Sequence, residues 1–351
     1  MEKQAIMTEE NKNQAPAERV LTVENLRVSF HTYAGEVKAV RGVDFKLDAG
    51  ETLAFVGESG CGKTVTAKAV MRLLPVPPGE ILPGSVVNFK GEDVLTMDKK
   101  RLRKYKGEDI GMIFQDAMTS LNPTMTCGKQ IMESLKIHTD LDAEGRKARA
   151  IELLDAVEIP EPEKRFKQYP HELSGGMRQR VMIAIALACE PTIMIADEPT
   201  TALDVTIQAQ IMKLLKELQL KEHTSIILVT HDLGVVANFA DRIQVMYAGQ
   251  VMETGSTEDI FKNPQHPYTW ALLRSIPRLD SEEKQDLYSL GGTPPDLILP
   301  LIGCPFTDRC DYAMQICKEA MPTRTEHGDH HCSYCWLHHP DAPKVERPVG
   351  D

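Results

Sequence analysis

The stretch GESGCGKT, residues 57–64, has the residue types and spacing of a loop that binds phosphate groups. It follows the apolar run TLAFV and opens the helical pattern KTVTAKAVMRLL, which argues against a chance glycine-rich turn. The glycines let backbone N–H groups turn inward around phosphate oxygens, and the helix N-terminus adds partial positive charge. Lys63 would reach the β- and γ-phosphates and Thr64 would bind Mg²⁺. The sequence therefore predicts a nucleoside triphosphate site at Gly57, Glu58, Ser59, Gly60, Cys61, Gly62, Lys63 and Thr64.

Acidic, amide and imidazole side chains close three other apolar runs. Asp197 and Glu198 end TIMIADEP, where Asp197 could hold Mg²⁺ and Glu198 could polarise an attacking water as general base. Gln115, in GMIFQD, could touch both Mg²⁺ and that water, and His231, in ILVTHD, could hydrogen-bond a γ-phosphate. Two solvated acids and a structural histidine are the alternatives. Ligands gather at the carboxyl ends of parallel strands, which favours the functional interpretation.

The stretch YPHELSGGMRQR, residues 169–180, places a serine and two glycines at the start of a helical pattern. Glycine costs about 1 kcal/mol inside a helix, so the pair is expected at a helix start or against a close neighbour. A free hydroxyl, bare N–H groups and a helix N-terminus also suit a phosphate. Because the chain already has one phosphate loop, we expect Ser174, Gly175 and Gly176 to face a nucleotide held by another copy or a partner.

Short apolar runs alternate with amphipathic helical patterns from about residue 20 to 252, which is typical of an α/β domain. TLAFV (52–56), TIMIA (192–196) and SIILVT (225–230) predict buried strands of a parallel sheet. An amphipathic helix is predicted between the last two strands by apolar residues that share one face: Ile207, Ile211, Leu214, Leu215 and Leu218.

Changes in character along the chain predict its domain boundaries. Residues 1–18 are polar and predict a disordered tail, and residues 19–255 predict a nucleotide-binding domain. Residues 117–190 are richer in helical pattern, so we expect an inserted helical subdomain there. Residues 256–351 are rich in proline and turns and predict a separate, loop-rich C-terminal segment.

The composition narrows the class of protein. A formal net charge of −11 over 351 residues leaves no basic surplus to neutralise phosphates, which argues against a nucleic-acid partner. The sequence has no apolar run of about 18 residues, and its polar, acidic start differs from a signal peptide. We therefore expect a cytoplasmic chain whose eight cysteines are reduced, metal-bound or catalytic rather than disulfide-bonded.

In their order along the chain, these motifs resemble the ABC ATPases over about residues 20–255: the phosphate loop, Gln115, LSGG, the strand-end acids, TALD (201–204) and His231. The resemblance implies a P-loop NTPase fold with an inserted helical subdomain. It also implies a dimer in which the LSGG residues of one subunit close over the ATP held by the other.

The same resemblance implies roles for residues outside the phosphate loop. Leu203 and Asp204, from TALD, would line the dimer seam, and Tyr33, before GEV, stands where the family usually places an aromatic that stacks on adenine. Met177 takes the place of the glutamine in the family's commoner LSGGQ signature. It lies beyond the phosphate-facing residues, so we expect no change in the chemistry.

Within the ABC ATPases, the chain resembles the detached D-type subunit of the oligopeptide/dipeptide permeases through VSFHTYAGEVKAVRGVDF, NPQHPYTWALLRSIPRLD, GTPPDL and GCPFTDRC. Such a subunit would energise peptide import from the cytoplasmic face of the cell membrane. Its partners would be a second ATPase subunit, commonly a different F-type chain, two membrane permease subunits and an extracellular substrate-binding protein. Nickel and glutathione importers share this tail. A non-transport ATPase of DNA repair or translation is the other alternative, but it would carry a long coiled-coil insertion or two cassettes.

Five cysteines gather in the C-terminal segment, whereas Cys61, Cys127 and Cys189 are interpreted as ordinary small residues. Zinc usually shows paired C-x-x-C knuckles, and only Cys332 and Cys335 have that spacing. Four thiolates from a loop-rich segment suit a [4Fe–4S] cluster, with zinc and unligated thiols as alternatives. Similar permease tails hold such a cluster, with the last ligand just before WL. That resemblance implies the ligands Cys304, Cys310, Cys317 and Cys335, and leaves Cys332 as a fifth thiol.

Overall fold

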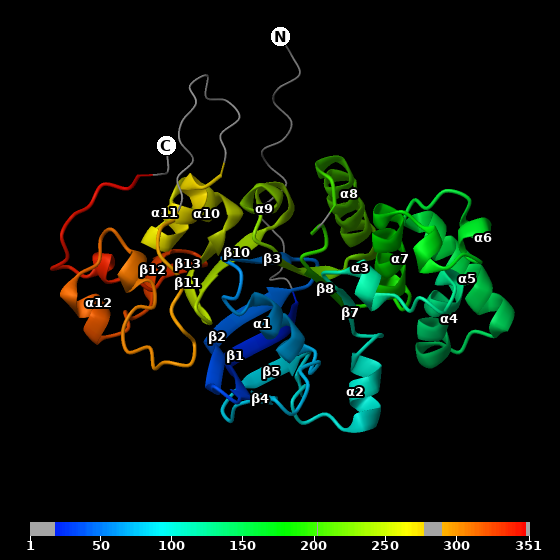
Figure 1. Ribbon diagram of the computed structural model, residues 1–351, viewed down its shortest axis with the longest axis horizontal. Helices are drawn as coiled ribbons and strands as arrows, with labels where there is room; N and C mark the ends of the chain where they lie inside the picture. Colours follow the sequence, from blue (N-terminus) through cyan, green and yellow to red (C-terminus); the bar gives the residue numbers. More distant parts are fainter. Residues whose placement is uncertain (1–17, 202, 277–289, 349–351) are drawn as a thin grey trace, which may run out of the picture.

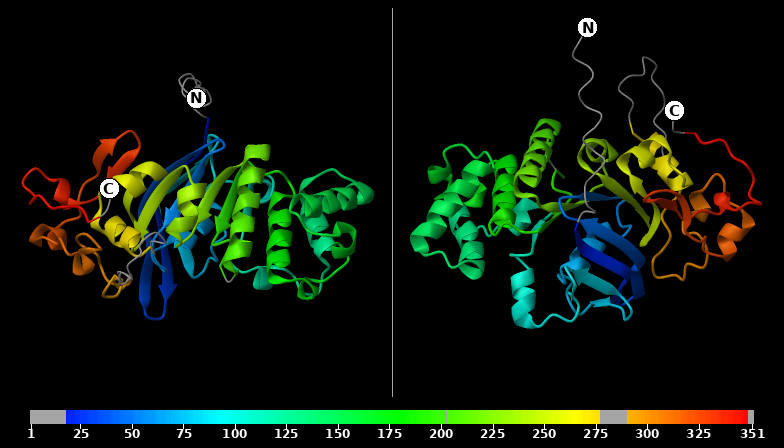
Figure 2. Two further views of the ribbon diagram at one scale, coloured as in Figure 1. Left: turned by 90° about the horizontal axis from the view of Figure 1, so that it is seen from above. Right: turned by 180° about the vertical axis from the view of Figure 1, so that it is seen from behind.

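The computed structural model describes residues 18–201, 203–276 and 290–348. The tail expected over residues 1–18 lies outside this part of the chain, apart from Glu18. Two β-sheets occupy the middle of the molecule, a lobe of helices lies at one end and the C-terminal segment at the other (Figure 1). The views from above and from behind show the same separation of the two ends (Figure 2).

The larger sheet has eight strands, and its central part is parallel from β10 through β3, β9 and β8 to β7. Every residue of β3, β7, β8 and β9 is buried, which explains their continuous apolar sequences. In spatial order the strands are β12 Thr325–Gly328, β13 His331–Ser333, β11 Gln250–Ser256, β10 Arg242–Tyr247, β3 Thr52–Val56, β9 Ser225–Val229, β8 Ile193–Asp197 and β7 Ile110–Ile113. The three strands expected from the apolar runs are β3, β8 and β9.

The second sheet is antiparallel and packs on the first both directly and through one helix. Its strands are β2 Gly35–Asp48, β1 Arg19–Thr32, β5 Val86–Phe89 and β6 Glu92–Asp93, with β4 Gly79–Ile81 pairing with β1. Helix α1 (Lys63–Val70) contacts strands of both sheets. Phe45 of β2 and Phe55 of β3 meet edge to face, with ring centroids 5.0 Å apart. The helix that follows the phosphate loop is thus fixed from two sides.

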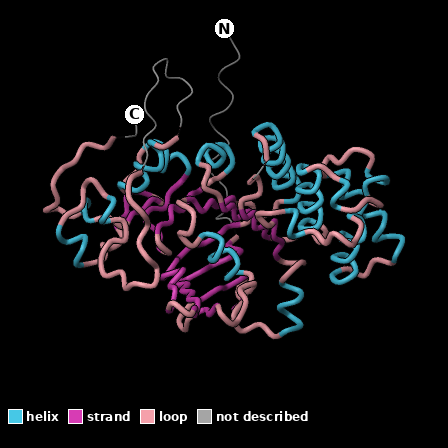
Figure 3. Tube along the Cα trace, in the orientation of Figure 1, coloured by secondary structure: helices cyan, strands magenta, loops and turns pink. Residues whose placement is uncertain are grey.

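Most helices lie on the face of the large sheet that is opposite to the smaller sheet, or in the lobe beyond β7 (Figure 3). The lobe comprises α3 Ala117–Ser120, α4 Cys127–His138, α5 Ala143–Ala156, α6 Pro162–Arg165 and α7 Gly175–Leu187. The others are α2 Lys99–Tyr105, α8 Val205–Glu222, α9 Leu233–Phe239, α10 Thr257–Lys262, α11 Pro267–Arg274 and α12 Gln315–Glu319. Several begin at an aspartate that caps free N–H groups, as Asp204 does for Ile207. None of the described helices combines the length and apolarity needed to cross a bilayer.

The C-terminal segment, for which the sequence predicts a separate region, contributes strands to the large sheet. Strand β13 pairs with β11, and β12 pairs with β13, so the segment extends the large sheet. The fully buried Glu253 of β11 accepts hydrogen bonds from the backbone N–H groups of Gln265 (2.6 Å) and His266 (2.9 Å) and from the side chains of Thr269 (2.6 Å) and His331 (2.9 Å). One carboxylate therefore ties β11, the start of α11 and β13 together.

Candidate functional site

The phosphate loop runs from the end of β3 to the start of α1, and two of its glycines are required by the backbone. Gly57 has φ +146°, and a Cβ there would lie 2.2 Å from the Met246 carbonyl oxygen. Gly62 has φ +101°, and a Cβ there would lie 2.6 Å from the Ala39 carbonyl oxygen. Since both positions exclude a side chain, the loop lies directly against the backbone of β10 and β2.

Lys63 folds back over this loop. Its Nζ donates to the carbonyl oxygens of Gly57 at 2.7 Å and Glu58 at 3.0 Å, and its side chain is buried. The ammonium group thus lies inside the curve of the loop, with carbonyl oxygens rather than a carboxylate as partners. This arrangement is suited to a ligand that brings negative charge, such as a polyphosphate.

Thr64 and Asp197 meet although they come from different elements. The Thr64 hydroxyl donates to Oδ1 of Asp197 at 2.7 Å, and Asp197 ends β8 with 2% exposure. Burial raises the pKa of the Asp197 carboxyl, an effect that a bound cation would oppose. A hydroxyl and a carboxylate in contact beside the phosphate loop are oxygen donors of the kind that Mg²⁺ prefers.

The carboxylate of Glu198 is the meeting point of three strand ends. It accepts hydrogen bonds from Gln115 Nε2 at 2.9 Å and Thr201 Oγ1 at 2.9 Å, and His231 Nδ1 lies 3.3 Å from its other oxygen. Gln115 follows β7 and His231 follows β9, so neighbouring parallel strands deliver all three predicted side chains to one place. Glu198 itself has φ +47°, an uncommon value for a residue with a side chain. Thr201 was not singled out from the sequence, where its signal is its position within the TALD motif.

The serine and glycines of LSGG form the start of α7, as expected. Ser174 caps the helix by accepting from the Met177 N–H at 3.3 Å. A Cβ on Gly176 would lie 2.9 Å from Cγ2 of Ile207, and one on Gly175 would lie 3.8 Å from Cδ2 of Leu203. The glycines therefore let this loop approach the start of α8. Within the described residues, no hydrogen bond joins it to the phosphate loop of the same chain.

Tyr33 lies at the tip of the β1–β2 hairpin with its side chain fully exposed. The nearby Phe30 instead packs against the core beside β4, within 3.2 Å of the Cβ that Gly79 would carry. Tyr33 is therefore the aromatic of this hairpin that is free to stack on a ligand, while Ala39 of β2 supports the phosphate loop.

Two side chains from the described part of the chain after residue 255 contact the phosphate loop, and neither residue was singled out from the sequence. The hydroxyl of Tyr268, in α11, accepts from the backbone N–H of Glu58 at 2.8 Å. Arg309 pairs with the Glu58 carboxylate at 2.5 and 2.8 Å. Neither contact has a local sequence signal, because both partners lie more than two hundred positions from the loop.

Four cysteines of the C-terminal segment line one small cavity: Cys304, Cys310, Cys317 and Cys335. Burial raises the pKa of Cys304 to about 11 and those of Cys310 and Cys335 to about 12, so these thiols are neutral near pH 7. Among the described side chains, no group of three or more His, Cys, Asp or Glu is arranged so that it could hold a metal ion.

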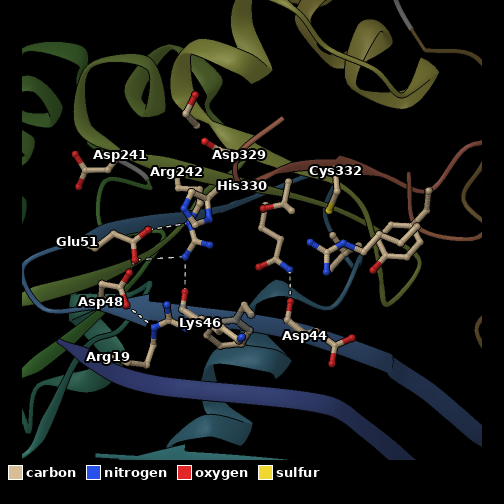
Figure 4. Close-up of a pocket in the computed structure, with 17 residues that line it drawn as sticks. Arg19, Asp44, Lys46, Asp48, Glu51, Asp241, Arg242, Asp329, His330 and Cys332 are labelled. Carbon is tan, nitrogen blue, oxygen red and sulfur yellow. Dashed lines mark hydrogen bonds and ion pairs between the residues drawn. The ribbon is translucent and has the colours of Figure 1, made fainter. Parts of the chain in front are cut away.

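Cys332 is placed apart from those four thiols. It lies on β13 and lines a different, larger pocket of about 450 Å³ between the two sheets, together with Arg324 and Tyr334. Figure 4 shows Cys332 in that pocket with charged side chains such as Glu51 and Arg242. The fifth thiol therefore does not share the cavity.

Comparison with known protein families identifies two regions. Residues 40–201 match the family described as ABC transporter, and residues 252–317 match the oligopeptide/dipeptide transporter C-terminal region. Solved structures with similar folds include the ATP-binding cassette MJ0796, in a dimeric post-hydrolysis state bound to ADP and Pi. It has 29% identity and a TM-score of 0.61 and covers 68% of this chain and 98% of that one. The expected P-loop ATPase core is thereby confirmed.

Full-length relatives are also similar. The oligopeptide transport ATP-binding protein OppD of Bacillus subtilis is 58% identical over 330 residues, which are 94% of this chain and 92% of the relative. The dipeptide transport ATP-binding protein DppD of the same organism is 54% identical, over 91% of this chain and 95% of the relative. OppD of Escherichia coli is 51% identical, over 88% of this chain and 90% of the relative. This chain therefore belongs to the ATP-binding subunits of the oligopeptide/dipeptide ABC transporter family.

Proposed function

We propose that this chain hydrolyses ATP to energise uptake of oligopeptides or dipeptides by an ABC importer. The observation that carries the proposal is the convergence beside the phosphate loop of the Thr64–Asp197 pair and of Glu198 with its partners Gln115 and His231. This arrangement supplies oxygen donors for Mg²⁺ and a carboxylate for a water within one site. The names of the relatives support the peptide substrate.

In the proposed reaction, the phosphates are held by the Lys63 ammonium and by backbone N–H groups of residues 57–64 other than those of Glu58 and Cys61, which donate within the chain. Mg²⁺ would be held by Thr64, Asp197 and Gln115, where it neutralises phosphate charge. Glu198 accepts the proton of the attacking water, because its carboxylate is already oriented by hydrogen bonds from neighbouring strand ends. His231 donates to the γ-phosphate, and the exposed ring of Tyr33 stacks on adenine.

The site is completed by a second ATPase subunit. Ser174 and Gly175 are exposed at the start of α7, and Gly176 holds this loop against α8, so all three are proposed to face the partner's nucleotide. Leu203 and Asp204 lie beside them and would form part of the dimer seam. ATP binding closes the dimer, closure moves the attached membrane subunits between their two facing states, and hydrolysis resets them.

The proposed assembly places this chain at the cytoplasmic face of the membrane. It includes an ATPase partner of the F type, two permease subunits and an extracellular binding protein, and no nucleic acid. Nickel and glutathione importers were the nearest alternatives from the sequence, and DNA repair or translation the more distant one. The relatives described above are named for oligopeptide and dipeptide transport, which favours peptides over these alternatives.

The substrate is tested on the complex purified from membranes through a tag on this chain and reconstituted in vesicles with its binding protein. We expect ATP hydrolysis and uptake of labelled peptide to rise together when a di- or oligopeptide is supplied. Nickel and glutathione serve as comparison substrates. Stimulation by either of them without stimulation by peptides would contradict the proposal.

We also propose that the cysteine-lined cavity holds a [4Fe–4S] cluster. Its support is the donor set, since the four thiols implied by the family resemblance line one cavity and Cys332 does not. When bound, the cluster would cross-link the loops of this segment.

Iron and acid-labile sulfide per chain, measured on protein purified without oxygen, test this proposal. We expect about four of each in the parent and in Cys332→Ser, because a [4Fe–4S] cluster needs only the four cavity thiols. Cys317→Ser should lose most of both. Zinc in place of iron, no metal at all, or loss of iron in Cys332→Ser would contradict the assignment.

A further inference from the structure

An arginine of the C-terminal segment, Arg309, forms two hydrogen bonds with the carboxylate of Glu58, the second residue of the phosphate loop. Nη1 of Arg309 donates to Oε2 at 2.5 Å and Nη2 donates to Oε1 at 2.8 Å. The Arg309 side chain is 4% exposed and that of Glu58 28%, so water reaches this pair mainly from the Glu58 side. A two-pronged contact of this kind fixes orientation as well as neutralising charge.

Every N–H group of the Arg309 guanidinium has an acceptor. Besides Glu58, Nη1 donates to the Tyr247 hydroxyl at 3.0 Å, Nε to the Gly291 carbonyl at 2.8 Å and Nη2 to the Leu290 carbonyl at 3.2 Å. Five donors in a planar fork are available only from arginine, since the lysine ammonium has three. The side chain therefore cannot move without breaking contacts on several elements.

Glu58 is also held through its backbone. Its N–H donates to Tyr268 at 2.8 Å, and its carbonyl oxygen accepts from Lys63 at 3.0 Å. Its three polar groups thus each have a partner, and two of those partners, Tyr268 and Arg309, lie beyond the nucleotide-binding domain expected from the sequence. The C-terminal half therefore helps to set the conformation of the loop that surrounds the phosphates.

We propose that Arg309 is a positioning residue for ATP binding. It keeps the Glu58 carboxylate paired and turned away, so that the loop N–H groups and Lys63 stay aimed at the triphosphate. Without Arg309, Glu58 would place a negative charge beside a negatively charged ligand without the cation that pairs with its carboxylate here. The attachment of the C-terminal segment then contributes to ATP affinity without supplying a group that touches ATP.

Titration of the full-length chain with a fluorescent ATP analogue tests this role. We expect Arg309→Met to raise the Kd for ATP about tenfold, which corresponds to one lost charge-assisted hydrogen bond. Adding Glu58→Gln to Arg309→Met should recover at least half of that loss, because the unpaired charge is gone. Arg324→Met is the matched control, since Arg324 lies in the same segment and its partners, Glu326 at 3.0 Å and the Cys332 thiol, both lie outside the phosphate loop.

Three outcomes would overturn the proposal. Parent-like affinity in Arg309→Met would show that the pair does not support the loop. A loss that Glu58→Gln leaves uncorrected would show that Arg309 acts through general stability. If Arg309→Met does not fold, Arg309→Gln, which removes the charge but keeps hydrogen-bonding groups, replaces it, and parent-like ATP affinity in that variant would count against the proposal. In the complex, the KM for ATP should rise by a larger factor than kcat falls.

Discussion

Glu253→Gln tests the buried carboxylate that joins the C-terminal segment to the large sheet. In the parent, each oxygen of Glu253 accepts two hydrogen bonds, one pair from Gln265 and His331 and the other from His266 and Thr269. A glutamine turns one oxygen into an NH₂ group, so one buried backbone N–H loses its acceptor, and Thr269 or His331 must accept a hydrogen bond in place of donating one. A hydrogen bond to a charged group contributes about 1.5–3 kcal/mol, so we expect the free energy of unfolding to fall by about 3–5 kcal/mol.

Urea unfolding followed by tryptophan fluorescence measures the free energy of unfolding of the C-terminal segment. The chain has two tryptophans, Trp270 in α11 and Trp336 after the last cavity cysteine, and both report on the C-terminal segment. Glu258→Gln is the matched control, because Glu258 is an exposed residue paired with Lys262, and we expect it to change stability by less than about 0.5 kcal/mol. A loss below about 1 kcal/mol in Glu253→Gln would refute the reasoning.

Two further predictions concern the loop and pH. Gly57→Ala should weaken ATP binding more than about tenfold, because the new Cβ would lie 2.2 Å from a carbonyl oxygen. Gly291→Ala is the control, because a Cβ there would meet nothing within 4 Å, and we expect it to bind ATP as the parent does. Equal ATP affinity in the two variants would contradict this prediction. Burial lowers the pKa of His266 to about 3, so below pH 6.5 the unfolded chain gains a proton that the folded chain does not, and stability falls. Between pH 7 and pH 5, His266 should lower the free energy of unfolding by about 2 kcal/mol. In urea titrations, the free energy of unfolding of His266→Asn should therefore fall by about 2 kcal/mol less than that of the parent over this pH range. If the free energy of unfolding depended on pH in the same way in the parent and in His266→Asn, the lowered pKa of His266 would be contradicted.

The parts of the fold predictable from sequence are those with local signals. Buried parallel strands are continuous apolar runs, and a glycine-rich loop between strand and helix has few structural solutions, so β3, β8, β9 and the phosphate loop were located in advance. Ser174 at the start of α7 follows from helix capping. Gln115 and His231 could be placed beside Glu198 because neighbouring parallel strands end at one edge.

The features that the sequence did not predict depend on contacts between distant segments. Strand β13 has three residues and no apolar alternation, so its pairing with β11 has no signature. The separation of Cys332 from the four cavity thiols follows from that pairing, because it turns Cys332 toward a different pocket. Arg309 and Glu58 are 251 positions apart, and each alone resembles an ordinary surface charge.

The most direct test of the central claim compares ATP binding and phosphate release in Glu198→Gln and the parent, within the complex purified through a tag on this chain. The amide keeps the shape of the side chain but cannot accept a proton. We expect ATP to bind as in the parent and phosphate release to fall by about 10²–10⁴-fold, the usual contribution of a general base. Phosphate release within threefold of the parent would contradict the assignment of Glu198 and the account of hydrolysis built on it.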